Sequence, residues 1–268
     1  MDKKFIQQAA AQLRTAEGNK LACNPIRNHF SEALRELSSE QKLQVAYDIK
    51  QYNHHYGLEK KHSSGIKIGM SSPFIQELFG ITEPDYGHLY QEMLLQPNDP
   101  LSLSQLIAPK LEVEWALRLN RDIIQPLSSE KELMACIDEI KLAFEIVDSR
   151  IKNWDVQAFD LIADNGSSGR YLVGHDSIKP DQIDLLKQPV CLYRNGEIVS
   201  EITANENLGN PWEFALWLVA KCIDIGSPLR RGDTLLTGTL TPIQEMSANE
   251  TWTASTPGLT DLSLSIIE

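Results

Sequence analysis

One segment, APKLEVEWALRLN at residues 108–120, constrains the fold of this chain more than any other. Its odd-numbered positions from Leu111 to Leu119 are all apolar, whereas Glu112 and Glu114 occupy even-numbered positions. Because successive side chains of a β-strand point to opposite faces, this alternation predicts a strand with one buried face. Both glutamates would then lie on the other face, about 7 Å apart.

The paired glutamates allow two interpretations. In the first, they lie on the water-facing side of an antiparallel strand, to which Arg118 and Asn120 would also belong. In the second, they supply two oxygen ligands to a hard cation such as Mg²⁺, which prefers carboxylates. A third ligand would then have to come from elsewhere in the chain.

The segment AFEIVDSRI, residues 143–151, offers that third carboxylate. Glu145 lies between Phe144 and Ile146 in a stretch that otherwise resembles a buried strand. Asp148 is the competing candidate. The pattern of these residues alone leaves open which of the two acids, if either, binds a cation.

Composition narrows the class of protein. The chain has 268 residues, of which 42% are hydrophobic, so it can form one large domain or two modest ones. A net charge of −12 and the lack of a basic face argue against a nucleic-acid partner. The four cysteines form no CxxC pair, which indicates a reducing compartment. We find no signal peptide and no apolar run that could span a membrane, and we expect a cytoplasmic protein with no membrane partner.

Apolar spacings of three and four predict helices throughout residues 2–60, with a helix that begins near Ser38 or Ser39 and ends at Gly57. After residue 62 the chain turns into short β-like segments, so we expect an α+β protein. These segments are residues 65–69, 109–119, 143–151, 170–174, 189–202, 233–238, 251–256 and 262–267.

Further patterns predict the connections. Residues 128–144 have a serine start and an acidic first turn, which indicate a helix, and Pro211 opens a second helix that should end before Gly226. Asn195-Gly196 predicts a hairpin turn, because both residues tolerate the positive φ of a type I′ turn. The segment EPDYG, residues 83–87, resembles a turn.

Two short segments could bind an anionic ligand. In GIKIG, Lys67 shares its face with Gly65 and Gly69, which leaves space for a ligand to approach the ammonium, although a solvated edge lysine is the plain alternative. The polar segment ADNGSSG, residues 163–169, follows a β-like run and carries Ser167 among residues that expose backbone N–H groups, or it is simply a turn.

The order of these motifs resembles the 2-oxopent-4-enoate (2-hydroxypentadienoate) hydratase family, with its sister 4-oxalocrotonate decarboxylases, inside the fumarylacetoacetase superfamily. The resemblance covers about residues 62–267 and is looser in the N-terminal helices. It rests on GIKIG (65–69), EPDYGHL (83–89), PKLEVEWALRLNRDI (109–123), EIVDSRIKNW (145–154), ADNGSSG (163–169), LGNP (208–211) and GDTLLTGTLTP (232–242).

The resemblance implies a set of site residues and a fold. The metal-binding glutamates of the family correspond to Glu112, Glu114 and Glu145, and the metal would be Mg²⁺ or Mn²⁺. The remaining correspondences are the catalytic Lys67, Asp85 and Ser167 and the substrate-binding Thr237, Gly238 and Thr239. The implied fold is a mixed β-sandwich roll over residues 63–268 with a helical N-terminal region over residues 1–62. A homo-oligomer is implied, with a sister hydratase or decarboxylase subunit as a further partner.

The implied activity is the metal-dependent addition of water to 2-hydroxypenta-2,4-dienoate, which gives 4-hydroxy-2-oxopentanoate in aromatic catabolism. Three departures from the family pattern leave the substrate open: Asn210 in place of histidine, Met70-Ser71 after GIKIG, and Arg170 after the ADN segment. Arg170 could bind the second carboxylate of a diacid, so decarboxylation of 4-oxalocrotonate is the alternative.

Two more functions fit the sequence less well. A C–C hydrolase of the acylpyruvate type would need a His–Glu pair on a lid, for which His54, His55 or His62 with Glu59 are the candidates. An inactive structural subunit of a complex with a decarboxylase would have little reason to retain Lys67, Asp85 and Ser167, which the resemblance places in the active site.

Overall fold

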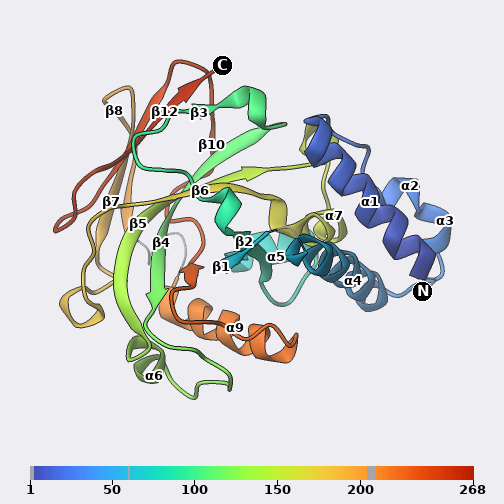
Figure 1. Ribbon diagram of the computed structural model, residues 1–268, viewed down its shortest axis with the longest axis horizontal. Coiled ribbons are helices and arrows are strands. Elements are labelled where there is room, and N and C mark those ends of the chain that lie inside the picture. The colour runs from blue at the N-terminus through green and yellow to red at the C-terminus, as the bar shows by residue number, and fades with distance from the viewer. Residues whose placement is uncertain (1–2, 60, 204–208) are drawn as a thin grey trace.

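Two β-sheets and a group of N-terminal helices make up the described part of the computed structural model, residues 3–59, 61–203 and 209–268 (Figure 1). The expected α+β class, with mixed sheets and a helical N-terminal region, is confirmed. The helices are α1 (Lys3–Asn19), α2 (Ile26–His29), α3 (Ser31–Leu34), α4 (Ser39–Leu58), α5 (Pro73–Phe79), α6 (Glu130–Met134), α7 (Ala158–Ala163) and α9 (Pro211–Asp224).

The larger sheet has seven strands in the order β2-β1-β9-β4-β5-β6, and β10 pairs with β4. Only the β1–β9 pairing is parallel among them, which makes the sheet mixed. Its strands are β1 (Ser63–Gly69), β2 (Asp85–Tyr90), β4 (Pro109–Leu119), β5 (Ile137–Asp148), β6 (Ser168–Val173), β9 (Thr234–Leu236) and β10 (Gln244–Glu245).

The smaller sheet has five strands in the order β3-β12-β11-β7-β8. Its strands are β3 (Leu101–Ser102), β7 (Pro189–Arg194), β8 (Glu197–Thr203), β11 (Thr251–Ser255) and β12 (Leu262–Ile267). The turn between β7 and β8 is the predicted hairpin turn, with φ of 53° at Asn195 and 82° at Gly196.

The main core lies between the two sheets and under α9. The apolar face of β4 (Leu111, Val113, Trp115, Leu117) and the matching face of β5 pack there against Leu192 of β7 and Trp252 of β11. Each such buried side chain stabilises the fold by about 1.5–3 kcal/mol. This core buries only one face of β4 and β5. Their opposite face, which includes Glu112, Glu114 and Glu145, is directed toward the N-terminal half of the chain.

The N-terminal helices share a second core with the part of the chain that follows β5. Ala46 and Ile49 of α4 pack with Phe159 and Ile162 of α7, and α1 covers α4. Figure 1 shows the blue helices α1 and α4 beside α7 and β2, at the far side from β7 and β8. None of the described helices is long and apolar enough to cross a membrane. The division of the chain at residues 62 and 63 stays a prediction.

The helix predicted for residues 128–144 is wrong beyond its first turn. Ser129 does cap α6, but α6 ends at Met134 and strand β5 follows. The register of β5 against β4 shifts near Arg118, which pairs with Glu139, whereas Leu119 pairs with Ile137. This β-bulge separates the inward-facing Ile137 and Ile140 by three positions, which imitates the spacing of a helix.

Three smaller predictions also need correction. Residues 85–87 belong to strand β2, not to a turn, because they pair with β1 along its length. Helix α4 continues past Gly57 and ends at Leu58. Because Gly57 has no side chain, Tyr90 can approach it closely: a Cβ at Gly57 would lie 3.2 Å from the Tyr90 hydroxyl oxygen. Residues 163–169 follow helix α7 instead of a β-like run. The expected starts of α4 and α9 are confirmed, with Ser38 and Asn210 as N-caps.

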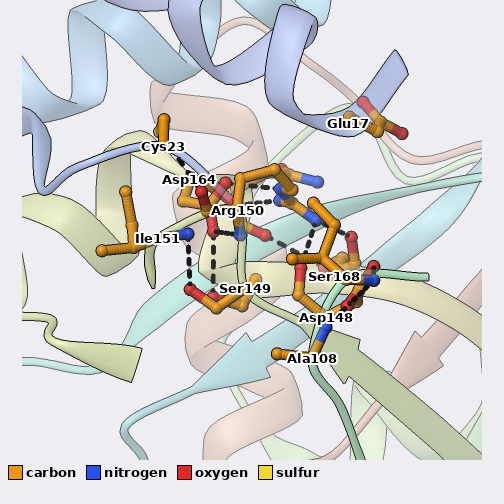
Figure 2. A network of polar contacts seen from close by, with 12 residues as sticks. Glu17, Cys23, Ala108, Asp148, Ser149, Arg150, Ile151, Asp164 and Ser168 are labelled. Atoms are coloured by element: carbon orange, nitrogen blue, oxygen red, sulfur yellow. Dashed lines mark hydrogen bonds and ion pairs between the residues drawn. The ribbon is translucent and has the colours of Figure 1, made fainter. Parts of the chain in front are cut away.

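A buried ionic network fixes the segment between α7 and β6 (Figure 2). Arg150 donates from Nε to Asp164 at 2.5 Å and from Nη1 to the carbonyls of Asp148 and Ser168 at 2.9 and 2.8 Å. The carboxylate of Asp148 in turn accepts the backbone N–H groups of Ile107 and Ala108. The guanidinium therefore joins the end of β5 to the end of α7, and the carboxylate of Asp148 joins β5 to the residues just before β4.

Replacement of Arg150 should destabilise the protein strongly. Arg150→Met leaves the buried Asp164 without its charge partner, so we expect a loss of about 3–5 kcal/mol in the free energy of unfolding. Urea denaturation monitored by circular dichroism measures this loss. Arg230→Met, which removes an exposed pair with Asp122, is the control and should leave stability nearly unchanged. Equal stability of the two variants would contradict the role of the network.

Candidate active site

Three carboxylates converge on the polar face of β4 and β5. Glu112 and Glu145 are direct partners in the antiparallel register of the two strands, and Glu114 follows two positions along β4. One oxygen from each carboxylate lies within 4.8 Å of the others. The structure thus brings together the three residues that the sequence predicted as metal ligands, and Glu145 joins them in preference to Asp148, whose oxygens are held by backbone N–H groups.

The triad fits a divalent cation. Glu114 and Glu145 are fully buried, and three of their four carboxylate oxygens have no hydrogen-bond partner in the described part of the chain. The fourth, Oε2 of Glu114, accepts the N–H of Gly238 at 2.8 Å. Burial and the neighbouring Glu145 raise the pKa of Glu112 to about 7, and the same two causes raise the pKa of Glu114 well above its usual range. The positive charge of a bound cation would offset the repulsion among the carboxylates and the cost of burying them.

Lys67 of β1 provides the one positive charge next to the triad among the described residues. Its Nζ lies 3.2 Å from Oε1 of Glu145, and its side chain is buried. Burial would lower its pKa, but the carboxylates of Glu145, Glu112 and Glu114 outweigh burial and raise it. One ammonium offsets only part of the charge of three carboxylates.

Glycines make room for Lys67. A Cβ at Gly87 would lie 3.0 Å from its Cε and 2.4 Å from Oγ of Ser168, and a Cβ at Gly166 would also lie 3.0 Å from the same Cε. No side chain can occupy either position without moving the lysine or its neighbours. Of the glycines predicted to flank it, Gly69 is not needed to make room for the lysine, since a Cβ there would lie 3.7 Å from Nζ, an ordinary contact distance.

Asp85 lies on the same face as Lys67, because Gly69 and Lys67 pair with Asp85 and Gly87 across β1 and β2. Its two oxygens have different surroundings. Oδ1 accepts a hydrogen bond from Nζ of Lys50 at 2.6 Å, whereas Oδ2 has no hydrogen-bond partner among the described residues. Such a carboxylate can exchange a proton with a ligand through its second oxygen.

Ser167 lies in an unusual loop. Asn165, Gly166 and Ser167 all have left-handed backbones, with φ of 57°, 59° and 55°, a conformation that persists only where the surroundings enforce it. The Ser167 hydroxyl donates to Oδ2 of Asp164 at 3.1 Å, and its N–H donates to the Asp164 carbonyl. Burial raises the pKa of Asp164 to about 6, against the lowering effect of Arg150. The N–H of Ser167 is therefore engaged within the loop.

A cavity of about 440 Å³ opens beside these groups. Six of the predicted site residues line it: Lys67, Asp85, Glu112, Ser167, Gly238 and Thr239. The rest of its lining includes the apolar residues Met70, Phe74, Ile75, Phe79, Leu161 and Ile243. Lys67 is the sole basic residue among the described residues that line the cavity. Thr237 is buried next to the cavity residue Gly238, and its hydroxyl has no partner in the described chain.

Two groups of candidates lie elsewhere. Arg170 pairs with Ile146, which faces the core between the sheets, so its side chain lies on the opposite face of β6 from the triad and does not line the cavity. The histidines proposed for a hydrolase are also away from it. His54 stacks on His88 with ring centroids 3.5 Å apart, and burial lowers its pKa to about 4, while the exposed His62 pairs with Glu92.

Two features of the site were not predicted from the sequence: Lys50 and the apolar residues that line the cavity. Lys50 follows Ile49 and lies one turn after Ala46, within the buried stripe of α4, and a charge in such a stripe is the signal that could have identified it. Half of these apolar residues belong to α5, a helix of seven residues with no fully buried side chain. Its short pattern carries too little periodicity to be recognised.

Comparison with known proteins agrees with this geometry. The family model described as fumarylacetoacetate (FAA) hydrolase C-terminal matches residues 81–266. A 2-keto-4-pentenoate hydratase from Paraburkholderia phymatum is 35% identical over 100% of this chain and 99% of its own length. A 2-hydroxyhexa-2,4-dienoate hydratase from Comamonas testosteroni is 26% identical over 100% of this chain and 99% of its own.

Among solved structures, the 4-oxalocrotonate decarboxylase from Pseudomonas putida G7, complexed with magnesium and adipate, superposes with a TM-score of 0.90. The match covers 100% of this chain and 99% of the decarboxylase at 24% identity, which establishes the shared fold. From the matched model and the full-length hydratase relatives, we conclude that this chain belongs to the fumarylacetoacetate hydrolase family, in the group of the 2-keto-4-pentenoate hydratases.

Proposed function

We propose that this protein is a metal-dependent hydro-lyase that adds water to 2-hydroxypenta-2,4-dienoate and releases 4-hydroxy-2-oxopentanoate. The observation that carries the proposal is the triad of Glu112, Glu114 and Glu145, of which Glu112 lines a cavity together with Lys67 and Asp85. Relatives named 2-keto-4-pentenoate hydratase, 35% identical over the full chain, support the same activity.

The triad would hold Mg²⁺, with Mn²⁺ as the substitute, because both accept several carboxylate oxygens. When bound, the cation would supply a Lewis acid that draws electron density from a 2-oxo acid. Lys67 adds a positive charge on the cavity side of Glu145, where it can bind the carboxylate of an anionic substrate. Ser167 also lines the cavity, and its hydroxyl, which donates to Asp164 in the structure, would have to exchange that hydrogen bond to donate to a substrate.

Proton transfer falls to Asp85 in this proposal. Ketonisation of the dienol moves a proton from the 2-hydroxyl to C5, and the water that then adds at C4 loses a proton while C3 gains one. Oδ2 of Asp85 accepts no hydrogen bond from the described residues, and Asp85 lines the cavity, so it can hold and return that proton. Oδ1 stays bound to Lys50 throughout.

The lining of the cavity favours a monoacid. A diacid such as 4-oxalocrotonate needs a second cation for its distal carboxylate, but no basic residue other than Lys67 occurs among the described residues of the lining. Much of the remaining lining consists of apolar side chains such as Phe74 and Phe79. A short substrate with an uncharged tail fits these surroundings better than a diacid.

The assembly that we propose is the one implied by the family resemblance, a homo-oligomer, with a sister decarboxylase subunit as a further partner. Phe74 and Leu78 of α5 are 71% and 67% exposed, which is consistent with a surface that another chain covers. Light scattering on the purified protein gives the stoichiometry.

Metal dependence is tested on the triad itself. Glu114→Gln should reduce Mn²⁺ affinity, measured by electron paramagnetic resonance, and turnover should fall by at least about 100-fold. Glu139→Gln is the matched control, because Glu139 also lies on these strands but pairs with Arg118 and Lys141. Treatment with chelator should abolish turnover of the unchanged protein, and Mg²⁺ should restore it. Full activity after chelation would refute the metal proposal.

Activity on two substrates separates the hydratase from the decarboxylase. The purified protein with Mg²⁺ should convert 2-hydroxypentadienoate, followed by the loss of its ultraviolet absorption, and release little CO₂ from 4-oxalocrotonate. The reason is the lack of a second cation in the described lining of the cavity. Faster turnover of the diacid would overturn the assignment in favour of decarboxylation. If neither substrate reacted while Mn²⁺ still bound, the protein would be an inactive subunit instead.

Arg170→Val tests the position of the arginine. Because its guanidinium lies on the face of β6 that is turned away from the triad, and donates to the carbonyl of Gly169, the variant should keep the KM for both substrates. Steady-state kinetics on the monoacid and the diacid measure this. A selective rise in KM for the diacid would show that the arginine reaches the substrate after all.

A further inference from the structure

A lysine on the N-terminal helix α4 reaches the wall of the candidate active site from behind. The Nζ of Lys50 donates to Oδ1 of Asp85 and to the carbonyl oxygen of Tyr86, both at 2.6 Å. It also lies 3.4 Å from the ring centroid of Tyr86 and 4.6 Å from that of Tyr47. The side chain exposes none of its surface.

We infer that Lys50 is a positioning residue for Asp85: it holds Oδ1 so that Oδ2 is kept free at the wall of the cavity. The inference rests on the proposed role of Asp85 in proton transfer. Lys50 does not line the cavity beside the triad and is not in contact with the triad, since it lines a different cavity.

The geometry of Asp85 requires such a partner. The carboxylate is 1% exposed, and an ionised carboxylate at that depth is costly unless a charge and hydrogen bonds compensate it. Lys50 supplies both to Oδ1, whereas Oδ2 accepts no hydrogen bond in the described part of the chain. Oδ2 is oriented toward the Ser167 loop, since a Cβ at Gly166 would lie 3.7 Å from it.

Lys50 is itself held in place from several sides. The stacked rings of Tyr47 and Tyr86, with centroids 5.7 Å apart, give it a cation–π environment, and the Tyr86 hydroxyl accepts a hydrogen bond from Gln51. The other charged groups around it are Lys67 and Lys221, which oppose its charge, so Asp85 is its one anionic partner in direct contact among the described residues. The position of each member of this pair therefore depends on the other.

The cavity behind Lys50 provides a direct test. It has a volume of about 360 Å³, and its lining includes residues of α1 and of α4, among them Lys50, together with Tyr90 and Asn165. When the side chain is shortened to alanine, a small alkylammonium ion can enter from this cavity and place its charge beside Asp85. A contribution to packing alone would not be restored in this way by a free cation.

The experiment compares four variants in the holoenzyme with Mg²⁺. Lys50→Met should lower kcat for 2-hydroxypentadienoate by about 10- to 100-fold with little change in KM, because the substrate does not touch this residue. Lys50→Arg should retain much of kcat, and Lys50→Ala should regain activity when butylammonium is added. Lys221→Met is the control, because this lysine also lies near Tyr47 but pairs with Glu83, and its kcat should be unchanged.

Several results would overturn the inference. They are an unchanged kcat in Lys50→Met, a change confined to KM, and a Lys50→Ala variant that butylammonium does not rescue. Thermal unfolding of each variant identifies any that fail to fold, and the crystal structure of Lys50→Met gives a readout that needs no turnover. An Asp85 carboxylate that keeps its position there contradicts the inference, and one that turns from the cavity supports it.

Measurements on the unchanged protein and on Lys50→Met distinguish failure of this inference from failure of the proposed function. If the unchanged protein does not hydrate 2-hydroxypentadienoate, the proposed function fails, and the position of Asp85 in the crystal structure of Lys50→Met then decides the role of Lys50. If the unchanged protein is active and Lys50→Met matches it, the inference fails and the proposed function stands.

Discussion

Repulsion among three neighbouring carboxylates, two of them fully buried, is the constraint on which the rest of this structure depends. Glu112 and Glu145 face one another across β4 and β5, and Glu114 lies beside them, with Lys67 as the single ammonium in direct contact among the described residues. Like charges that are directly opposite in a sheet destabilise it, and burial makes the cost larger. The arrangement persists because the opposite face of the same two strands is buried in the main core, which determines the register.

The surroundings of the triad follow from the same constraint. Lys67 can reach Glu145 only because Gly87 and Gly166 have no side chains, and Gly166 belongs to a loop with three left-handed residues in a row. That loop is held by Asp164, which is itself held by Arg150. The loop conformation, the lysine and the carboxylates therefore form one connected structure instead of independent contributions to a site.

The N-terminal helices take part in the site as well as in the packing. Helix α4 buries Ala46 and Ile49 against α7, and the next residue, Lys50, extends to Asp85. The cavity residue Asp85 is thus in contact with a helix of the N-terminal region. The segments that define the family resemblance do not include this helix, although the relatives match along the whole chain.

Much of the site could be predicted from sequence because its signals are local. The alternation in residues 111–119 determines which face carries Glu112 and Glu114, and the order of seven short motifs indicates the family. The bulge opposite Arg118 could not be predicted, because it depends on the pairing of β4 with β5, and it makes the start of β5 resemble a helix. The turn predicted at residues 83–87 failed for the same reason, since β2 is a strand only through its pairing with β1.

The amino-acid sequence by itself determined that Glu112 and Glu114 share one face of a strand, and it indicated the class of the fold, because both follow from residue types at a fixed short spacing. Only the tertiary structure decided that Glu145 and not Asp148 completes the triad, that Arg170 lies away from it, and that Lys50 supports Asp85. These choices depend on strand register and on the packing of helices against sheets, which bring together residues that are distant along the chain.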